Sequence, residues 1–309
     1  LAIAAGGTLA GAFNAVVAPR LFTDVSEYPL VIGAACLMQA SGRRLREVLT
    51  TPRLLARPLL AAAIAVGGLA IGSALRLGPG EMLGMLGVSS LVAFGTRRDP
   101  ARFALSVVLL LLAGASIPGA AWGRVVEAER TFFGVYRVSL DERARFISLF
   151  HGTTLHGRQV FGDRDPEAKT YYHPRSPIGR VLAARASRQD LAVGVVGLGV
   201  GSLAAYARPG HTWTFYEIDP AVERIARNTQ YFGYLDRCGT RCRVVVGDAR
   251  LSLAGETGRF DVLVLDAFSS DAIPVHLLTK EAVAVYLDRL QTDGVIALQA
   301  TNRLVDIAP

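Results

Sequence analysis

The 309-residue sequence predicts an α-helical membrane region, followed by a small β-module and an α/β unit with a doubly wound sheet. Leu, Ala, Val and Gly runs crowd residues 1–126 of a chain that is 51% hydrophobic. Short β-rich runs come next, and from Leu191 onward candidate strands alternate with candidate helices. That alternation is typical of a parallel sheet covered by helices on both faces. We therefore expect three domains, at residues 1–126, 131–175 and 176–309.

Apolar stretches in the first domain are candidates for spanning helices, which need roughly 20 apolar residues. The first, third and fifth of five stretches are about that long, and the other two are shorter: Leu1–Phe22, Tyr28–Ala40, Pro58–Leu75, Met82–Phe94 and Phe103–Trp122. The sequence opens on an apolar run without a charged leader, so no signal peptide is visible. We expect a helical membrane region that is truncated at its N-terminal end.

The net charge of +7 belongs mainly to arginine-rich loops between the apolar stretches, at Arg43–Arg57 and Arg97–Arg102. Such loops face the cytoplasm, and this arrangement indicates membrane topology rather than a nucleic-acid partner. If all five stretches cross the bilayer, the C-terminal half lies outside the cell. If Met82–Phe94 does not cross, that half lies in the cytoplasm. We favour the second arrangement and expect a multi-pass protein of the bacterial inner membrane with a cytoplasmic soluble domain.

The β-module is predicted from two runs, Phe132–Ser139 and Arg145–Phe150, which flank a polar turn and read as a hairpin. A third strand is expected at Thr154–Phe161 and a helix at Ser176–Arg188. The α/β unit then has five expected strands, at Ala192–Gly197, Thr212–Glu217, Arg243–Gly247, Phe260–Asp266 and Gly294–Ala300. Three helices are expected between these strands: one that begins at Ser202, one at Pro220–Tyr231 and one at Pro274–Leu290. Ligands of such sheets bind at the carboxyl ends of the strands.

A glycine-rich turn follows the first of these strands, where Gly197, Gly199 and Gly201 form G-x-G-x-G. The dinucleotide fingerprint is G-x-G-x-x-G, and the tighter spacing fits a methionine-derived sulfonium cofactor better than NAD. Glu217 ends the second strand, where a carboxylate can accept hydrogen bonds from both ribose hydroxyls. Asp248 follows the third strand and is placed to accept from an adenine amino group. These five residues predict a site for an adenosyl nucleoside.

Cys238 and Cys242 form a C-x3-C pair without a second pair of ligands. Structural zinc requires four ligands. We therefore expect no metal, and we expect both cysteines to be reduced thiols that serve packing.

Several short motifs are shared with one known family: residues 132–135, 151–157, 171–174, the glycine turn, 217–220, 247–249 and 266–274. They resemble the spermidine synthase family, and more closely its membrane-fused, spermidine synthase-like branch, which residues 13–15 and 27–29 also resemble. The resemblance implies a small β-domain ahead of a Rossmann-like, methyltransferase-type fold. Such a sheet usually has two more strands than residues 302–309 can supply, so we expect it to be C-terminally incomplete.

The resemblance also implies an activity, the transfer of an aminopropyl group from decarboxylated S-adenosylmethionine to a small-molecule amine. The family's catalytic base matches Asp266. Its second acid resembles Asp271, although the spacing here is two residues longer. Tyr172 and His173 resemble a pair that binds the amine substrate. His151 and His156 are expected to serve hairpin turns, and His276 is expected in the first turn of a helix.

Val200 is the main departure from the family, because it stands where the family has an aspartate that holds the donor's ammonium group. This departure leaves three alternatives open. Another acid takes the place of the aspartate, the donor is ordinary S-adenosylmethionine, or the activity is weak. The alternatives to an aminopropyltransferase are thus an S-adenosylmethionine-dependent methyltransferase, and a non-catalytic polyamine- or nucleoside-binding domain of a membrane transporter or sensor. The expected partners are an amine substrate and membrane lipid. Whether the protein forms a homo-oligomer is left open.

Overall fold

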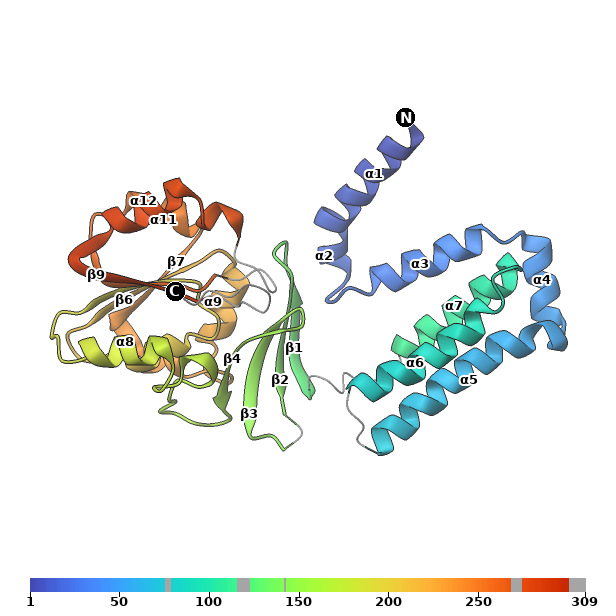
Figure 1. The fold of residues 1–309 in the computed structure, drawn as a ribbon, viewed down its shortest axis with the longest axis horizontal. Helices are drawn as coiled ribbons and strands as arrows, with labels where there is room; N and C mark the ends of the chain where they lie inside the picture. Colours follow the sequence, from blue (N-terminus) through green and yellow to red (C-terminus); the bar gives the residue numbers. More distant parts are fainter. Residues whose placement is uncertain (76–78, 116–122, 142, 268–273, 300–309) are drawn as a thin grey trace, which may run out of the picture. The chain divides into compact units, whose positions relative to one another are not determined.

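The computed structural model describes residues 1–75, 79–115, 123–141, 143–267 and 274–299 (Figure 1). Contacts within the chain define two compact units. One unit comprises Val25–Gly123, and the other combines Leu1–Asp24 with Arg124–Pro309.

The unit at Val25–Gly123 is helical. It contains α3 (Glu27–Met38), α4 (Gly42–Thr50), α5 (Pro52–Ala74), α6 (Pro79–Phe94) and α7 (Pro100–Ala115). The last three begin at a proline, a residue whose fixed φ and missing N–H suit the first helical position. Arg44 in α4 binds Asp99, just before α7, with 2.6 Å between Nη2 and Oδ2. This ion pair ties α4 to the connection between α6 and α7.

One helix in the described part of the chain, at Pro52–Gly72, is long and apolar enough to cross a membrane. Only 22% of that stretch is buried, which is unlike the core helix of a soluble protein. The third predicted stretch is therefore found as a long apolar helix. The fifth gives the shorter α7, and its remainder extends into residues 116–122, outside the described part. The first forms α1 (Ala2–Ala12) and α2 (Ala18–Leu21), separated by a π-helical turn at Phe13–Val17.

The β-module is an antiparallel sheet with strand order β1-β2-β3-β4. Its strands are β1 (Arg124–Arg130), β2 (Val135–Leu140), β3 (Phe146–His151) and β4 (Thr154–Val160). The predicted hairpin and third strand are confirmed, since β2 pairs with β3 and β3 with β4. The sequence analysis missed β1, an edge strand in which four of seven residues are charged, as is common for protected sheet edges.

A five-stranded parallel sheet with strand order β7-β6-β5-β8-β9 follows the β-module in the same unit. Its strands are β5 (Ala192–Val196), β6 (Thr212–Glu217), β7 (Cys242–Val246), β8 (Phe260–Leu265) and β9 (Leu290–Leu298), so the Rossmann-like prediction is confirmed. Helices α11 (Ala249–Gly255) and α12 (Lys280–Asp288) cover one face (Figure 1). The other face shares a core with the β-module and with α8 (Pro177–Arg185), α9 (Pro220–Arg227) and α10 (Tyr234–Cys238).

Two predicted helices are wrong in type or extent. The segment after the glycine turn forms a 3-10 helix at Ser202–Tyr206 instead of an α-helix. Pro209 follows closely, and a residue that precedes proline disfavours the α conformation. The long helix predicted at Pro274–Leu290 is divided into a 3-10 turn at Val275–Leu277 and α12. The hydroxyl of Thr279 caps α12 by accepting from the Ala282 N–H at 3.2 Å.

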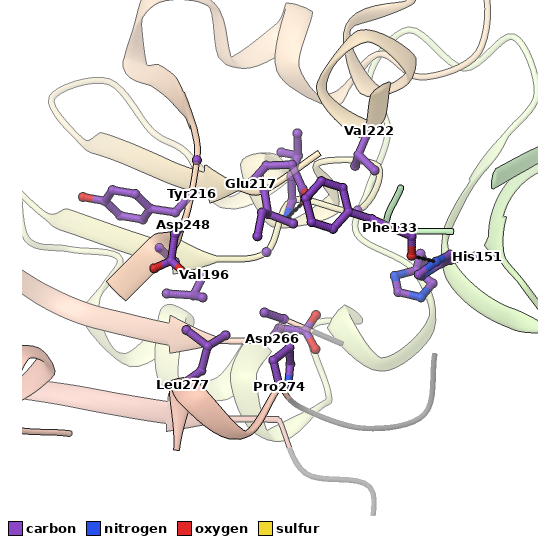
Figure 2. Close-up of a pocket in the computed structure, with 18 of the residues that line it drawn as sticks. Phe133, His151, Val196, Tyr216, Glu217, Val222, Asp248, Asp266, Pro274 and Leu277 are labelled. Carbon is purple, nitrogen blue, oxygen red and sulfur yellow. Dashed lines mark hydrogen bonds between the residues drawn. The ribbon is translucent and has the colours of Figure 1, made fainter. Parts of the chain in front are cut away.

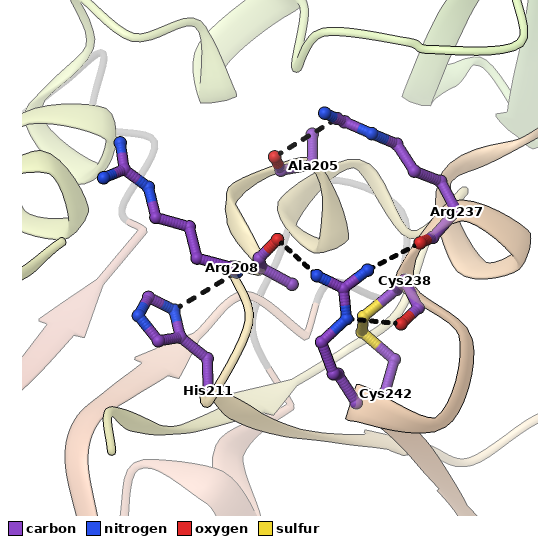
Figure 3. Close-up of a disulfide and its surroundings, with 8 residues drawn as sticks. Ala205, Arg208, His211, Arg237, Cys238 and Cys242 are labelled. Carbon is purple, nitrogen blue, oxygen red and sulfur yellow. Dashed lines mark hydrogen bonds between the residues drawn. A yellow bond between two sulfur atoms is a disulfide. The ribbon is translucent and has the colours of Figure 1, made fainter. Parts of the chain in front are cut away.

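The prediction of reduced cysteines is wrong, because Cys238 and Cys242 form a disulfide (Figure 3). The chain turns back through a 3-10 turn at Gly239–Arg241, and the two Cα atoms lie 5.7 Å apart, a usual separation for a disulfide. The Arg241 guanidinium fastens the turn by donating to the carbonyl oxygens of Cys238, Ala207 and Arg237. The C-x3-C spacing alone does not reveal this reversal of direction.

Candidate functional site

A cavity of about 450 Å³ lies at the carboxyl ends of β5, β6, β7 and β8, and residues of the β-module complete its wall (Figure 2). The predicted acids Glu217, Asp248 and Asp266 all line it. No lysine or arginine is among the described lining residues. The cavity therefore has the electrostatic character of a site for a positively charged ligand.

The glycine turn after β5 brings the backbone close to the end of β8. Gly197 has a φ of +97°, and a Cβ atom there would lie 2.3 Å from the backbone oxygen of Asp266. Only glycine fits this conformation and this contact. Gly197 and Gly199 line the cavity, whereas Gly201 lies beyond the lining, packed against Leu235 of α10.

Glu217 joins the glycine turn to the end of β6. One carboxylate oxygen accepts from the Leu198 N–H at 3.1 Å, and the other accepts from the Asp219 N–H at 3.0 Å. Burial raises the pKa of Glu217, and these backbone donors oppose that rise by favouring the ionised form. The carboxylate has acceptor capacity left for hydroxyl groups of a ligand.

Asp248 lies at the end of β7 and begins α11. Its Oδ1 accepts from the Leu251 N–H at 2.9 Å, and its Oδ2 lies 3.3 Å from Nε2 of His276. Asp248 thus has the helix-capping role that any acid in this position can have. It still lines the cavity, and His276 lines it too, from a 3-10 turn instead of an α-helix.

Asp266 follows β8 and differs from the other two acids, because it accepts its hydrogen bond from a side chain instead of from backbone N–H groups. The Tyr172 hydroxyl donates to its Oδ2, and Tyr172 is held in turn by the Tyr206 hydroxyl, which donates to the Tyr172 carbonyl at 2.5 Å. Burial raises the pKa of Asp266 to about 8. This carboxyl group can therefore gain and lose a proton near neutral pH.

Three further residues complete the account of the predicted site. His173 does not line the cavity, and its Nδ1 accepts from the Arg175 N–H at 3.2 Å within a turn. Asp271 lies outside the described residues. Val200 is 1% exposed and packs against Gly157 of β4 rather than lining the cavity. The glycine turn therefore adds no charged side chain to the wall.

The sequence analysis missed the aromatic part of the wall. Phe133, Tyr136, His151 and His156 of the β-module all line the cavity. Both histidines flank a β-hairpin turn, and their turn position gave no reason to connect them with the glycine turn. The signal available was their place in one motif, residues 151–157, that resembles a known family.

Comparisons with curated proteins find two relevant similarities, and no family model matches the chain. A polyamine aminopropyltransferase of Vibrio vulnificus (strain CMCP6) is 33% identical over 150 residues, which cover 46% of this chain and 49% of that protein. An N-terminal histidine N-methyltransferase of Emericella nidulans is 34% identical over 110 residues, which cover 34% of this chain and 19% of that protein. The chain thus spans about half the length of the first relative.

Among solved structures, a probable spermidine synthase from Corynebacterium glutamicum ATCC 13032 has a TM-score of 0.45 and 21% sequence identity. The match covers 57% of this chain and 63% of that chain. The similarity to the spermidine synthase family that the motifs indicate is confirmed by the curated aminopropyltransferase. The membrane-fused branch stays a prediction.

Proposed function

Because this chain is similar to a polyamine aminopropyltransferase, we propose that it transfers an aminopropyl group from decarboxylated S-adenosylmethionine to an amine. One observation carries the proposal. Asp266, with a pKa raised to about 8, lines the same cavity as the two acids that suit a nucleoside. A single cavity therefore combines a binding surface for the donor with a group that can accept a proton.

The donor would lie along the carboxyl ends of the strands. Glu217 suits the ribose hydroxyls, because its carboxylate is fixed by two backbone N–H groups. Asp248 suits the adenine amino group, and the backbone at Gly197 and Gly199 allows close approach. The absence of cations from the described lining supports a sulfonium ligand without a carboxylate.

The reaction itself is a displacement at carbon. The amine nitrogen attacks the carbon next to the sulfonium, the C–S bond breaks, and 5′-methylthioadenosine leaves as a neutral thioether. The attacking nitrogen must lose one proton, and the Asp266 carboxylate accepts it before passing it to water. A base is most effective when its pKa lies near the working pH, as the pKa of Asp266 does. The hydrogen bond from Tyr172 orients the carboxylate.

A second candidate function is methyl transfer from S-adenosylmethionine to an amine. The side chain of Val200 is apolar and does not line the cavity, so the glycine turn offers no acid for an ammonium group of the donor. The 34% identity to a histidine N-methyltransferase also supports this candidate. Both reactions transfer a carbon from sulfonium to nitrogen, and both can use Asp266 as the base.

The experiment that separates these candidates uses the purified chain with each sulfonium donor and a panel of mono- and diamines. Mass spectrometry distinguishes acceptors that gain C3H7N from acceptors that gain CH2. We expect the first product, and its loss in Asp266→Asn. Methylated acceptors would replace the proposal by the second candidate. Nucleoside binding without either product would favour a non-catalytic binding domain.

We also propose that the helical unit anchors this domain to a bilayer, with lipid as its partner. The length and apolar character of α5 support the proposal. Extraction of cell membranes with alkaline carbonate tests it, since an anchored chain stays in the membrane pellet and a peripheral one is released.

A further inference from the structure

The β-module wall of the cavity is formed by four aromatic rings, those of Phe133, Tyr136, His151 and His156. Tyr136 and His151 stack with 4.7 Å between ring centroids and 23° between ring planes. His151 and His156 meet edge to face, with their centroids 5.3 Å apart. Tyr136, His151 and His156 thus form one continuous aromatic surface, and Phe133 lines the same cavity.

The local backbone is built to hold His151 in this wall. Gly134 has a φ of +149°, and a Cβ atom there would lie 2.0 Å from Nε2 of His151, so the ring occupies space that only glycine leaves open. The Nε2 atom lies 3.0 Å from the Phe133 carbonyl oxygen. Since a carbonyl only accepts, Nε2 carries the hydrogen, and Nδ1 of the neutral ring retains a lone pair.

The charges around the wall favour a cation. Burial lowers the pKa of His151, which keeps the ring neutral. Behind the rings lies Asp219, 1% exposed, which accepts from the Thr131 hydroxyl at 2.5 Å. Burial raises the pKa of the Tyr136 phenol, and the negative charges of Asp219 and Glu217 raise it further. The rings therefore present electron-rich faces in a negative field, the combination that binds alkylammonium groups.

The position of the wall indicates which part of the donor meets it. In Figure 2, Tyr216 and Asp248 lie at one end of the cavity, Phe133 and His151 lie at the other, and Glu217 and Asp266 lie between them. With adenine at Asp248 and ribose at Glu217, the substituents on the 5′ sulfur extend toward the rings.

We propose that Phe133, Tyr136, His151 and His156 form a subsite for the alkylammonium arm of the nucleoside donor. The inference rests on the proposed function and names what replaces the missing acid at Val200. Aromatic faces and an imidazole nitrogen hold the arm in place of a carboxylate. The subsite belongs to binding, so it can be tested without turnover.

Calorimetric binding of three nucleosides to the full chain tests the subsite. Decarboxylated S-adenosylmethionine has the sulfonium and the ammonium arm, the dimethylsulfonium analogue of 5′-deoxyadenosine has only the sulfonium, and 5′-methylthioadenosine has neither charge. Phe133→Leu keeps apolar bulk but removes the π face. We expect it to weaken binding of the first nucleoside about 3- to 30-fold and to change the other two less than about twofold. His156→Leu should show the same selectivity.

The matched control is Phe132→Leu, since Phe132 is the neighbouring ring, is 76% exposed and does not line the cavity. It should leave all three affinities unchanged. Phe133→Tyr keeps the aromatic face and should therefore bind decarboxylated S-adenosylmethionine as tightly as wild type does. Equal losses for all three nucleosides, or no loss for the first one in either wall variant, would overturn the subsite. Wild-type chain that binds none of them refutes the proposed function as well. Wild-type chain that binds all three equally refutes the subsite alone.

Discussion

The two flanks of β5 hold their acids in different ways. On the β6–β7 flank, Glu217 and Asp248 accept hydrogen bonds from backbone N–H groups. On the β8 flank, Asp266 accepts from the Tyr172 hydroxyl, and burial raises its pKa to about 8. Backbone donors cannot move without unfolding the turn that contains them, whereas a phenol can rotate. The first flank is thus suited to hold a ligand, and the second is suited to exchange a proton.

The largest effect that this comparison predicts is on turnover. Asp266→Asn keeps the shape of the side chain but removes the proton acceptor, and we expect kcat to fall about 10²- to 10⁴-fold. Nucleoside affinity should stay within about threefold of wild type, because the β6–β7 flank is untouched. Stopped assays with mass detection and calorimetry measure the two quantities. A variant that loses affinity and keeps turnover would exchange the roles of the two flanks.

Asp266→Asn should also be more stable than wild type. A gain in stability would exclude misfolding as the cause of its lost turnover. The pKa of Asp266 is raised from 3.8 to about 8 by folding, so its favourable contribution exists below about pH 4 and is lost as the pH rises through 8. The advantage of Asn should grow by at most roughly 1.4 kcal/mol per pH unit across that window. Thermal unfolding at pH 5, 7 and 9 measures this trend.

The second effect is on affinity and tests the other flank. Glu217→Gln removes the charge and replaces one carboxylate oxygen by a donor that repels a backbone N–H. Hydrogen bonds to a charged group contribute about 1.5–3 kcal/mol, so we expect nucleoside affinity to fall roughly 10- to 150-fold. The exposed acid Asp190 offers a control, Asp190→Asn, which should bind normally. Unchanged binding in Glu217→Gln would refute the assignment of this flank to the nucleoside.

The third effect is on the pH dependence and sharpens the role of the β8 flank. Asp266 must be ionised to accept a proton, so kcat/KM should rise with pH through about 8 and level off above that pH. Tyr172→Phe removes a donor that favours the ionised form, so the pKa of Asp266 should rise by about one unit and the rate at pH 7 should fall roughly tenfold. Tyr171→Phe removes the neighbouring hydroxyl and should leave the profile in place. A profile that is identical in Tyr172→Phe and wild type would exclude this coupling.

The strand ends were predictable from the sequence because their signals are local. Buried apolar runs followed by a glycine turn or an acid predict the carboxyl ends of parallel strands, and those ends necessarily meet at one edge of the sheet. Glu217, Asp248 and Asp266 come together for that reason. The β-module wall was not predictable in this way. His151 lies in the antiparallel sheet, Gly199 follows a strand of the parallel sheet, and only tertiary packing brings them to one cavity.

Two other differences have local causes that sequence patterns represent poorly. Strand β1 has charged residues at four of seven positions and lies at a sheet edge, so it lacks the apolar alternation of a half-buried strand. The disulfide depends on the backbone turn at Gly239, where φ is +59°, and not on cysteine spacing.

The smallest predicted effect concerns this disulfide, at the outer edge of the β6–β7 flank. It closes α10 onto β7, and Leu235 of α10 packs against Gly201 of the glycine turn. Replacing both Cys238 and Cys242 by serine should cost about 2 kcal/mol of stability, as expected for a loop this short. Nucleoside affinity should fall less than about threefold and turnover should not change, because Glu217 still fixes the turn through Leu198. Calorimetry and thermal unfolding of the double variant measure both, with alkylation of denatured, unreduced wild-type chain to establish that the bond is formed. An affinity loss as large as that of Glu217→Gln would mean that the disulfide, rather than the backbone donors, keeps this flank rigid.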